Sequence, residues 1–197
     1  MTLRNLCVYC GAATGTDPDH AAAAERLGRL MAEAGIGLVY GGGSVGLMGI
    51  LARAALENGG HVTGIIPQFL KDREIMLGEA SELVITADMH ERKRLMFDRS
   101  DAFLALPGGI GTLEETIEMM TWAQLGQHRK PIVLANFKGF WAPLIALLEH
   151  MTIGGFVHSS PAGRLYTVVD RIEDVLPTQR SLTPRVGVDD PGAAALM

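Results

Sequence analysis

The stretch that decides the fold, residues 89–125, reads MHERKRLMFDRSDAFLALPGGIGTLEETIEMMTWAQL. Within it, residues 102–106 are a continuous apolar run, typical of a parallel strand covered on both faces. A glycine turn at 107–112 follows, and 113–125 have helical composition, with Glu114–Glu115 in the expected first turn. Glycines after a strand let backbone N–H groups approach an anion at a helix N-terminus, where the helix dipole favours negative charge. The sequence therefore predicts a phosphate site beside a carboxylate.

Strand-like and helix-like segments alternate along the whole chain. Strands are predicted at 6–9, 37–40, 62–66, 102–106, 131–134 and 166–169, and helices at 17–34, 46–57, 89–100, 112–125, 141–151 and 171–176. Residues 68–87 are less regular, and we expect a loop with one short helix there. This order indicates an α/β fold, a Rossmann-like doubly wound parallel sheet with helices on both faces. We expect residues 1–177 to form a single nucleotide-binding domain and residues 178–197 a flexible C-terminal tail.

Three glycine loops follow predicted strands, at residues 11–15, 41–44 and 107–112. In a doubly wound sheet the ligand binds beyond the carboxyl ends of the strands, where the strand order reverses, so the three loops should share one edge. The G-x-G-x-x-G spacing after the first strand is absent, so NAD and FAD are not expected. For 41–44 and for 107–112 the alternative is a tight turn without a ligand.

Arg92 stands out in the charged helix because Met89, Arg92 and Met96 recur at helical spacing. Arg92 thus lies beside an apolar stripe, whereas His90 is expected in solvent. A cation on the buried side of a helix needs an anionic partner, which could be a substrate or a structural salt bridge. The sequence leaves both open, and no spacing of His, Cys or acidic residues predicts a metal site.

Composition excludes several classes of protein. With 48% hydrophobic and 20% charged residues the chain is not disordered, and its net charge of −5 argues against general nucleic-acid binding. No apolar run is long enough to span a bilayer, and residues 1–5 lead directly into a strand rather than a signal peptide. Cys7 and Cys10 could form a redox or metal pair, but Cys7 sits in a predicted strand, which favours buried, reduced thiols. We expect a cytoplasmic protein with no nucleic-acid or membrane partner.

The helix after Thr112 is predicted to be apolar on more than one side. Leu113, Ile117 and Met120 share one face, and Met119, Trp122 and Ala123 lie elsewhere. One face can pack on the sheet, so the other predicts a homodimer through this helix, with cover by another part of the chain as the alternative.

At these positions the sequence resembles the Lonely Guy family, the cytokinin-activating phosphoribohydrolases, over residues 7–175. The family signature P-G-G-x-G-T-x-x-E stands at 107–115 and the block D-M-H-x-R-K at 88–93. Further matches are VYGGGS at 39–44, GLMG at 46–49 and TWAQLG at 121–126. The first loop departs from the pattern, because Ala12 and Ala13 stand where the family often has two serines.

The resemblance implies hydrolysis of the N-glycosidic bond of adenosine 5′-monophosphates, with or without an N6 substituent, releasing free base and ribose 5-phosphate without a cofactor. It implies that Arg92 and Glu115 are the catalytic pair. Together with the glycine loops, it gives the following expected substrate-binding residues: Gly42, Gly43, Ser44, Glu74, Arg92, Lys93, Gly108, Gly109, Ile110, Gly111, Thr112, Leu113, Glu114, Glu115 and Thr121.

Other functions stay open at this point. Many relatives carry the older label lysine decarboxylase, but none of the lysines follows a histidine, as the pyridoxal phosphate lysine commonly does. A general AMP nucleosidase is one alternative, and a non-catalytic nucleotide or cofactor carrier on the same fold is another. The pairing of Arg92 with Glu115 favours an enzyme.

Overall fold

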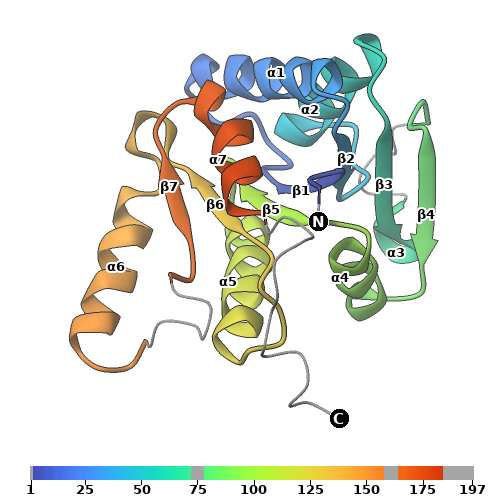
Figure 1. The fold of residues 1–197 in the computed structure, drawn as a ribbon. Coiled ribbons are helices and arrows are strands. Elements are labelled where there is room, and N and C mark those ends of the chain that lie inside the picture. The colour runs from blue at the N-terminus through green and yellow to red at the C-terminus, as the bar shows by residue number, and fades with distance from the viewer. Residues whose placement is uncertain (1, 72–77, 158–163, 184–197) are drawn as a thin grey trace.

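The structure is a computed structural model that describes residues 2–71, 78–157 and 164–183. Within these residues a sheet of seven parallel strands runs in the order β4-β3-β2-β1-β5-β6-β7 (Figure 1). The strands are β1 (Asn5–Tyr9), β2 (Gly37–Tyr40), β3 (Val62–Pro67), β4 (Glu82–Thr86), β5 (Ala102–Ala105), β6 (Ile132–Ala135) and β7 (Thr167–Val169). The order reverses between β1 and β5, so the predicted doubly wound α/β fold is confirmed.

Helices cover both faces of the sheet. They are α1 (Pro18–Glu33), α2 (Gly46–Glu57), α3 (Gln68–Lys71), α4 (Met89–Asp98), α5 (Ile110–Gln124), α6 (Ala142–Ile153) and α7 (Val175–Leu182), with 3-10 turns η1 (Phe137–Gly139) and η2 (Ile172–Asp174). One buried cluster joins α1, α2 and α7 to the sheet, and a second joins α4, α5 and α6 to its other face. Because β5 is buried on both faces, its sequence is a continuous apolar run.

Three sequence-based expectations need correction. Residues 82–86, predicted as loop, form the edge strand β4, whose half-exposed side chains lack the continuous apolar run of a central strand. Helix α5 begins at Ile110 with Gly109 as its N-cap, so Glu114 and Glu115 lie in its second turn rather than its first. Helix α7 runs past the predicted boundary at residue 177 to Leu182, and its Gln179 is fully buried.

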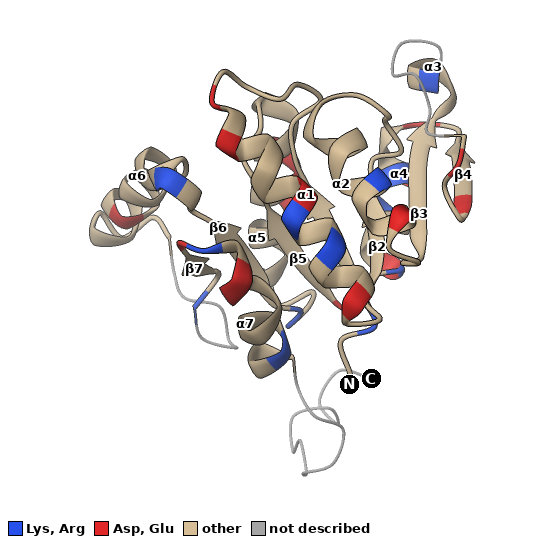
Figure 2. Cartoon of the chain, turned by 90° about the horizontal axis from the view of Figure 1, so that it is seen from above, with Lys and Arg blue, Asp and Glu red and all other residues tan. Residues whose placement is uncertain are grey.

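The remainder of the predicted tail, residues 184–197, lies outside the described residues. None of the helices within the described ranges is long and apolar enough to cross a membrane. On the face that carries α1, the positions of Lys and Arg are interspersed with those of Asp and Glu (Figure 2). The pair Glu25–Arg29 on α1 is one example of this mixed charge.

Cys7 and Cys10 belong to opposite faces of the sheet. Cys7 packs in the cluster under α4 and α5, and Cys10 packs in the cluster under α1 and α2. Both are free and buried, and burial raises the pKa of Cys7 to about 12 and also raises that of Cys10. Because redox and metal chemistry need the thiolate, the geometry favours the buried, reduced alternative. Across the described ranges, no group of three or more His, Cys, Asp or Glu side chains could hold a metal ion.

His128 is a buried titratable group between α5 and β6. Its Nδ1 accepts a hydrogen bond from the backbone N–H of Lys130 at 3.1 Å. Its Nε2 therefore carries the proton and donates to the carbonyl oxygen of Met119 at 2.9 Å. Burial is the main reason that the pKa of His128 is lowered from 6.5, so the folded protein favours the neutral ring.

We expect this histidine to make the protein less stable in acid. The contribution of neutral His128 is complete above pH 6.5 and is lost as the pH falls through the lower folded-state pKa, because the unfolded chain binds the proton more readily. Each unit of pKa difference corresponds to about 1.4 kcal/mol of unfolding free energy. Urea unfolding between pH 5 and 7.5 should therefore show a shallower pH dependence for His128→Gln than for wild type. The exposed His150→Gln is the control, and an unchanged slope in His128→Gln would contradict the expectation.

Candidate active site

The three glycine loops meet at the carboxyl edge of the sheet, as expected from the strand order. The backbone N–H of Gly11 donates to the carbonyl of Pro107 at 3.1 Å, and that of Leu47 donates to the carbonyl of Gly11 at 3.0 Å. A side chain at Gly108 would lie 2.2 Å from Thr112 Oγ1 and 2.9 Å from the backbone nitrogen of Gly11. Glycine is therefore needed at this crossing for the loops after β1 and β5 to pack together.

The N-terminus of α5 is open to a ligand. Gly109 caps the helix without a side-chain hydrogen bond, and the backbone N–H groups of Ile110, Gly111 and Thr112 have no partner within the helix. Ile110 is 82% exposed and Gly111 is also exposed, so an anion can reach these donors. The helix dipole adds to their attraction for a phosphate.

A cavity of about 440 Å³ opens beside this helix terminus. The first loop (residues 11–15), Leu47 and the turn after β5 line it, and His20 and Phe140 close its far side. Much of the lining is glycine backbone and small apolar side chains, which lets a ligand approach closely. Ala12 and Ala13 are part of this lining, so the two departures from the family pattern face the cavity.

Arg92 and Glu115 come together across α4 and α5. Arg92 is 6% exposed and Glu115 is 9% exposed, and Arg92 Nη2 lies 3.5 Å from Glu115 Oε1. Arg92 Nε also donates to the carbonyl oxygen of Ile65 at 3.1 Å. Helical spacing predicted the burial of Arg92, and the structure identifies its anionic partner as the expected catalytic glutamate.

Gly41 makes room for that arginine and was missing from the expected site residues. A Cβ atom at this position would lie 2.2 Å from Arg92 Nη2 and 3.1 Å from Met48 Sδ. The guanidinium group therefore lies against the bare backbone at the end of β2. Residues 41–43 are three consecutive glycines. This run is the sequence signal that could have indicated a side chain packed closely against the backbone.

Lys93, the neighbour of Arg92, points to a different part of α5. Its ammonium nitrogen lies 2.7 Å from Glu114 Oε1 and 3.0 Å from Glu118 Oε1. Burial lowers the pKa of Lys93, but these two carboxylates outweigh burial and raise it overall, so the amine stays protonated. A Schiff base needs the unprotonated amine, so this site does not support the lysine decarboxylase label.

The other expected site residues are only partly brought together. Gly42 and Gly43 are buried just after β2, Gly42 with a φ of +80°, and Ser44 is half-buried. Leu113 is half-buried on α5, and Thr121 is exposed near the opposite end of that helix. Glu74 lies outside the described residues.

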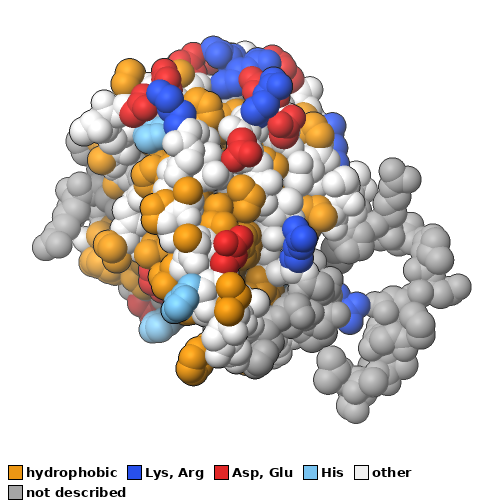
Figure 3. All heavy atoms as spheres, turned by 90° about the vertical axis from the view of Figure 1, so that its left-hand side faces the viewer, with side chains coloured by type: hydrophobic (Ala, Val, Ile, Leu, Met, Phe, Trp, Pro, Cys, Tyr) orange, Lys and Arg blue, Asp and Glu red, His pale blue; other side chains and the backbone are white. Residues whose placement is uncertain are grey.

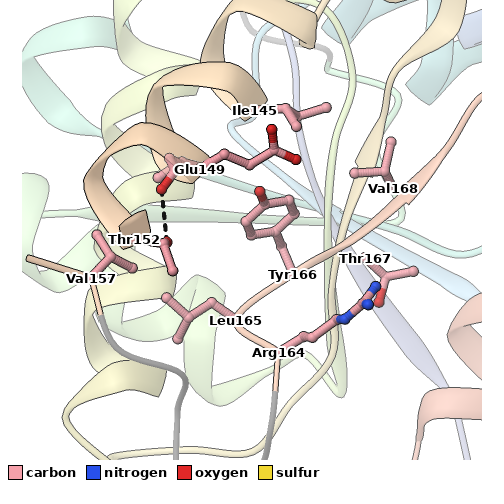
Figure 4. Close-up of a pocket in the computed structure, with 10 residues that line it drawn as sticks. Ile145, Glu149, Thr152, Val157, Arg164, Leu165, Tyr166, Thr167 and Val168 are labelled. Atoms are coloured by element: carbon pink, nitrogen blue, oxygen red, sulfur yellow. Dashed lines mark hydrogen bonds between the residues drawn. The ribbon is translucent and has the colours of Figure 1, made fainter. Parts of the chain in front are cut away.

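A second cavity, of about 450 Å³, lies away from these residues between α6 and β7 (Figure 4). Its lining is mainly apolar, and the Glu149 carboxylate and the Tyr166 ring point toward one another across it (Figure 4). Burial is the main reason that the pKa of Tyr166 is raised, and the Glu149 charge adds to the rise. None of the motif residues lines this cavity, so it is separate from the candidate site at the carboxyl edge of the sheet.

Comparison with known proteins shows the family to which the chain belongs. Residues 48–178 match the family described as possible lysine decarboxylase. The chain is 47% identical over 161 residues to a cytokinin riboside 5′-monophosphate phosphoribohydrolase of Arabidopsis thaliana, covering 82% of this chain and 73% of the relative. It is 43% identical over 181 residues to the enzyme of that name from Rhodococcoides fascians, covering 91% of each. The chain belongs to this family, the Lonely Guy family.

Solved structures share the fold of this Lonely Guy protein at lower identity. A molybdenum cofactor binding protein from Rippkaea orientalis has a TM-score of 0.69 and 21% identity, covering 93% of this chain and 99% of that one. The Moco carrier protein from Chlamydomonas reinhardtii also has a TM-score of 0.69, with 20% identity, covering 91% and 97% of the two chains. At this identity the likeness shows the fold alone.

Proposed function

We propose that this Lonely Guy protein hydrolyses the N-glycosidic bond of N6-substituted adenosine 5′-monophosphates, releasing the free base and ribose 5-phosphate. The observation that carries this proposal is the buried contact of Arg92 with Glu115 one turn inside the open N-terminus of α5. Relatives that are 43% and 47% identical are named for this activity. No cofactor is needed for the hydrolysis of such a bond.

Phosphate binding positions the substrate. The backbone N–H groups of residues 110–112 hold the 5′-phosphate, and the glycine loops leave room for the sugar. Holding the phosphate fixes the ribose relative to Glu115, so that binding energy is used for orientation. Gly108 and Gly109 form the wall of this phosphate site, and Gly42, Gly43 and Ser44 form its edge on the β2 side.

The chemistry then needs one carboxylate and one water molecule. As the bond from C1′ to the purine nitrogen breaks, its electron pair leaves with the purine and positive charge develops at C1′. Glu115 stabilises that charge and takes a proton from the water whose oxygen bonds to C1′. The departing purine takes up a proton in turn, so the proton count balances. The guanidinium group of Arg92, 3.5 Å from Glu115 Oε1, holds the carboxylate in place.

Thr121 joins the site only if a second copy of the chain is present. At about 1.5 Å per residue, Thr121 lies roughly 18 Å from Gly109 along α5. It is exposed, whereas Glu115 on the same helix is buried, so the two side chains face different surroundings. An antiparallel pairing of α5 with α5 of a partner subunit would bring the partner's Thr121 to the opposite phosphate site. The second apolar face on which the sequence-based homodimer rested is covered within the chain, because Met119 and Ala123 are buried there. The homodimer that we propose therefore rests on Thr121 and on the exposed residues of α5.

The surface around α5 and α6 supports the same assembly. Ile110 and Leu125 are exposed at the two ends of α5, and hydrophobic side chains gather over the neighbouring α6 face (Figure 3). Light scattering at micromolar concentration is expected to give the mass of a dimer, about 42 kDa from a chain of 21.1 kDa. A mass of one chain under these conditions would contradict the homodimer.

The activity is tested by product analysis. Incubation with isopentenyladenosine monophosphate, followed by chromatography, should release the free base, and AMP should release adenine more slowly. Equal rates would support a general AMP nucleosidase instead. No base from either substrate would support a non-catalytic carrier, the function named for one of the structures that share this fold.

The buried, free thiols of Cys7 and Cys10 fit the cytoplasmic setting that we propose for this reaction.

A further inference from the structure

The glycine loop after β2 is held from two sides. Its first half lies on the sheet, because Gly41 directly follows β2 and a Cβ atom at Gly42 would lie 3.0 Å from Cβ of Ile66 on β3. Its second half, Ser44 and Val45, leads into α2, and no side chain caps that helix. The position of Ser44 therefore depends on contacts with α2 rather than with the sheet.

Arg53 of α2 makes the contact that fixes Ser44. Its Nη1 donates a hydrogen bond to the carbonyl oxygen of Ser44 at 2.9 Å. Gly49 lies one turn before Arg53 on the same face of the helix, and a Cβ atom there would lie 1.9 Å from that carbonyl oxygen. Gly49 thus provides the space, and Arg53 the hydrogen bond, that hold the Ser44 carbonyl against α2.

The guanidinium group of Arg53 is used for the backbone and not for an ion pair. Arg53 is half-buried, and within the residues that the structure describes it has no carboxylate at ion-pair distance. The carbonyl of Ser44 is the one acceptor of its side chain among these residues. A charged group that is partly removed from water needs such a partner, so this contact accounts for the place of Arg53 in the fold.

The direction of the Ser44 carbonyl also sets the direction of the next amide. In a trans peptide the C=O and N–H bonds point to opposite sides, so the Val45 N–H points away from Arg53. The next two donors of α2, the N–H groups of Leu47 and Met48, both go to the carbonyl oxygen of Gly11. The Val45 N–H has no acceptor in the described part of the chain, so a ligand can take it.

Without Arg53 the peptide that joins Ser44 to Val45 can turn over. The run of three glycines just before it restricts backbone rotation least of all residue types. A turned peptide would present the carbonyl oxygen in place of the N–H. That oxygen carries partial negative charge, so it would repel a phosphate where the N–H attracts one.

We infer that Arg53 is a positioning residue, which orients the peptide between Ser44 and Val45 so that its N–H, and not its carbonyl oxygen, faces the phosphate of the substrate. Arg53 acts through the loop and does not touch the nucleotide. The inference rests on the proposed function and deepens it, because Arg53 lies outside the motifs at 39–44 and 46–49. The carboxylate that performs the chemistry belongs to α5, so the loss should appear in nucleotide affinity and not in kcat.

The first arm of the test removes the guanidinium group. Arg53→Ala is expected to raise the Kd for AMP about tenfold, the scale of one hydrogen bond to a charged group. Calorimetry in a Glu115→Gln background gives this Kd without turnover. With Glu115 present, KM for the nucleotide should rise by a similar factor and kcat should stay within about threefold of wild type. The control is Arg29→Ala, which removes an exposed arginine on α1 and should leave Kd unchanged.

The second arm moves the same carbonyl and keeps the charge. In Gly49→Ala the new Cβ atom forces the Ser44 carbonyl off α2 while Arg53 remains, so Kd should rise about as much as in Arg53→Ala. Alanine favours the helix more than glycine does, which offsets part of the cost in stability. Because both substitutions act on one peptide, the double variant should bind AMP no more weakly than the weaker single variant.

Three results would overturn the inference. Unchanged Kd and KM in a folded but less stable Arg53→Ala would make the contact merely structural. Wild-type Kd in Gly49→Ala would show that the place of the Ser44 carbonyl does not matter. Additive rises in the double variant would make Arg53 a direct ligand of the nucleotide. A wild-type protein that binds AMP but releases no base would instead refute the proposed function, and the Kd comparison would still decide the role of Arg53.

Discussion

Glu115→Gln is expected to lower kcat by about a hundredfold or more, the usual contribution of a general base. The amide has the shape of the carboxylate, so it fills the same buried place on α5 next to the guanidinium group of Arg92. It has no charge to stabilise C1′ and cannot take a proton from water. The substitution therefore removes the chemistry while leaving the phosphate site at residues 110–112 intact.

Two measurements check this expectation. Calorimetry with AMP should give a Kd close to that of wild type, and circular dichroism should show a folded protein. Because one partner of a buried pair loses its charge, the unfolding free energy is expected to fall without loss of the fold. Retention of wild-type turnover in Glu115→Gln would remove Glu115 from the mechanism.

Gly41→Ala is expected to abolish most activity through Arg92. The new Cβ atom would lie 2.2 Å from Arg92 Nη2, so the guanidinium group must move and lose its contacts with Ile65 and Glu115. A displacement of about 1 Å at a catalytic group can cost a hundredfold in rate, and we expect a loss of that order in kcat. Because the end of a flexible side chain moves rather than backbone, the cost in unfolding free energy should stay at about 1–3 kcal/mol.

A matched glycine offers the control. Among the described residues, a Cβ atom at position 78 meets nothing within 4 Å, so Gly78→Ala should leave kcat and stability near wild type. Kinetics and urea unfolding of the two alanine variants compare the effects directly. Wild-type kcat in Gly41→Ala would show that the exact place of Arg92 is not needed.

The order of strands and helices was predictable because each is indicated by the local pattern of apolar and polar residues. The apolar run after Ser100 indicated a central strand, and the strand is buried on both faces. Helical spacing placed Arg92 on the buried side of α4, where the structure has it. The edge strand β4 was missed because its side chains are half-exposed, which removes the pattern that marks a buried strand.

The partners of the charged residues were not predictable in the same way. Lys93 meets Glu114 and Glu118 only because the sheet brings α4 and α5 side by side, and no sequence spacing encodes that contact. The start of α5 at Ile110 is also not evident from the sequence, because glycines favour turns in general although Gly109 serves here as the N-cap. Position 41 requires glycine because the guanidinium group of Arg92 lies against it. That contact arises from the fold and is not encoded in the local sequence.

The fold alone does not decide between an enzyme and a carrier. The cofactor-binding protein and the carrier protein that share this fold are 21% and 20% identical to the chain, whereas relatives named as phosphoribohydrolases are 43% and 47% identical. What separates the two functions is whether a sugar carbon reaches the carboxylate of Glu115, because function depends on the site and not on the fold.

A crystal structure of the Glu115→Gln variant with bound AMP tests that claim most directly. The account predicts the phosphate on the backbone N–H groups of residues 110–112 and the C1′ atom of the ribose about 3–3.5 Å from the side chain at position 115 or from a water molecule that it holds. A ribose bound elsewhere, or a side chain at position 115 turned away from the sugar, would contradict it.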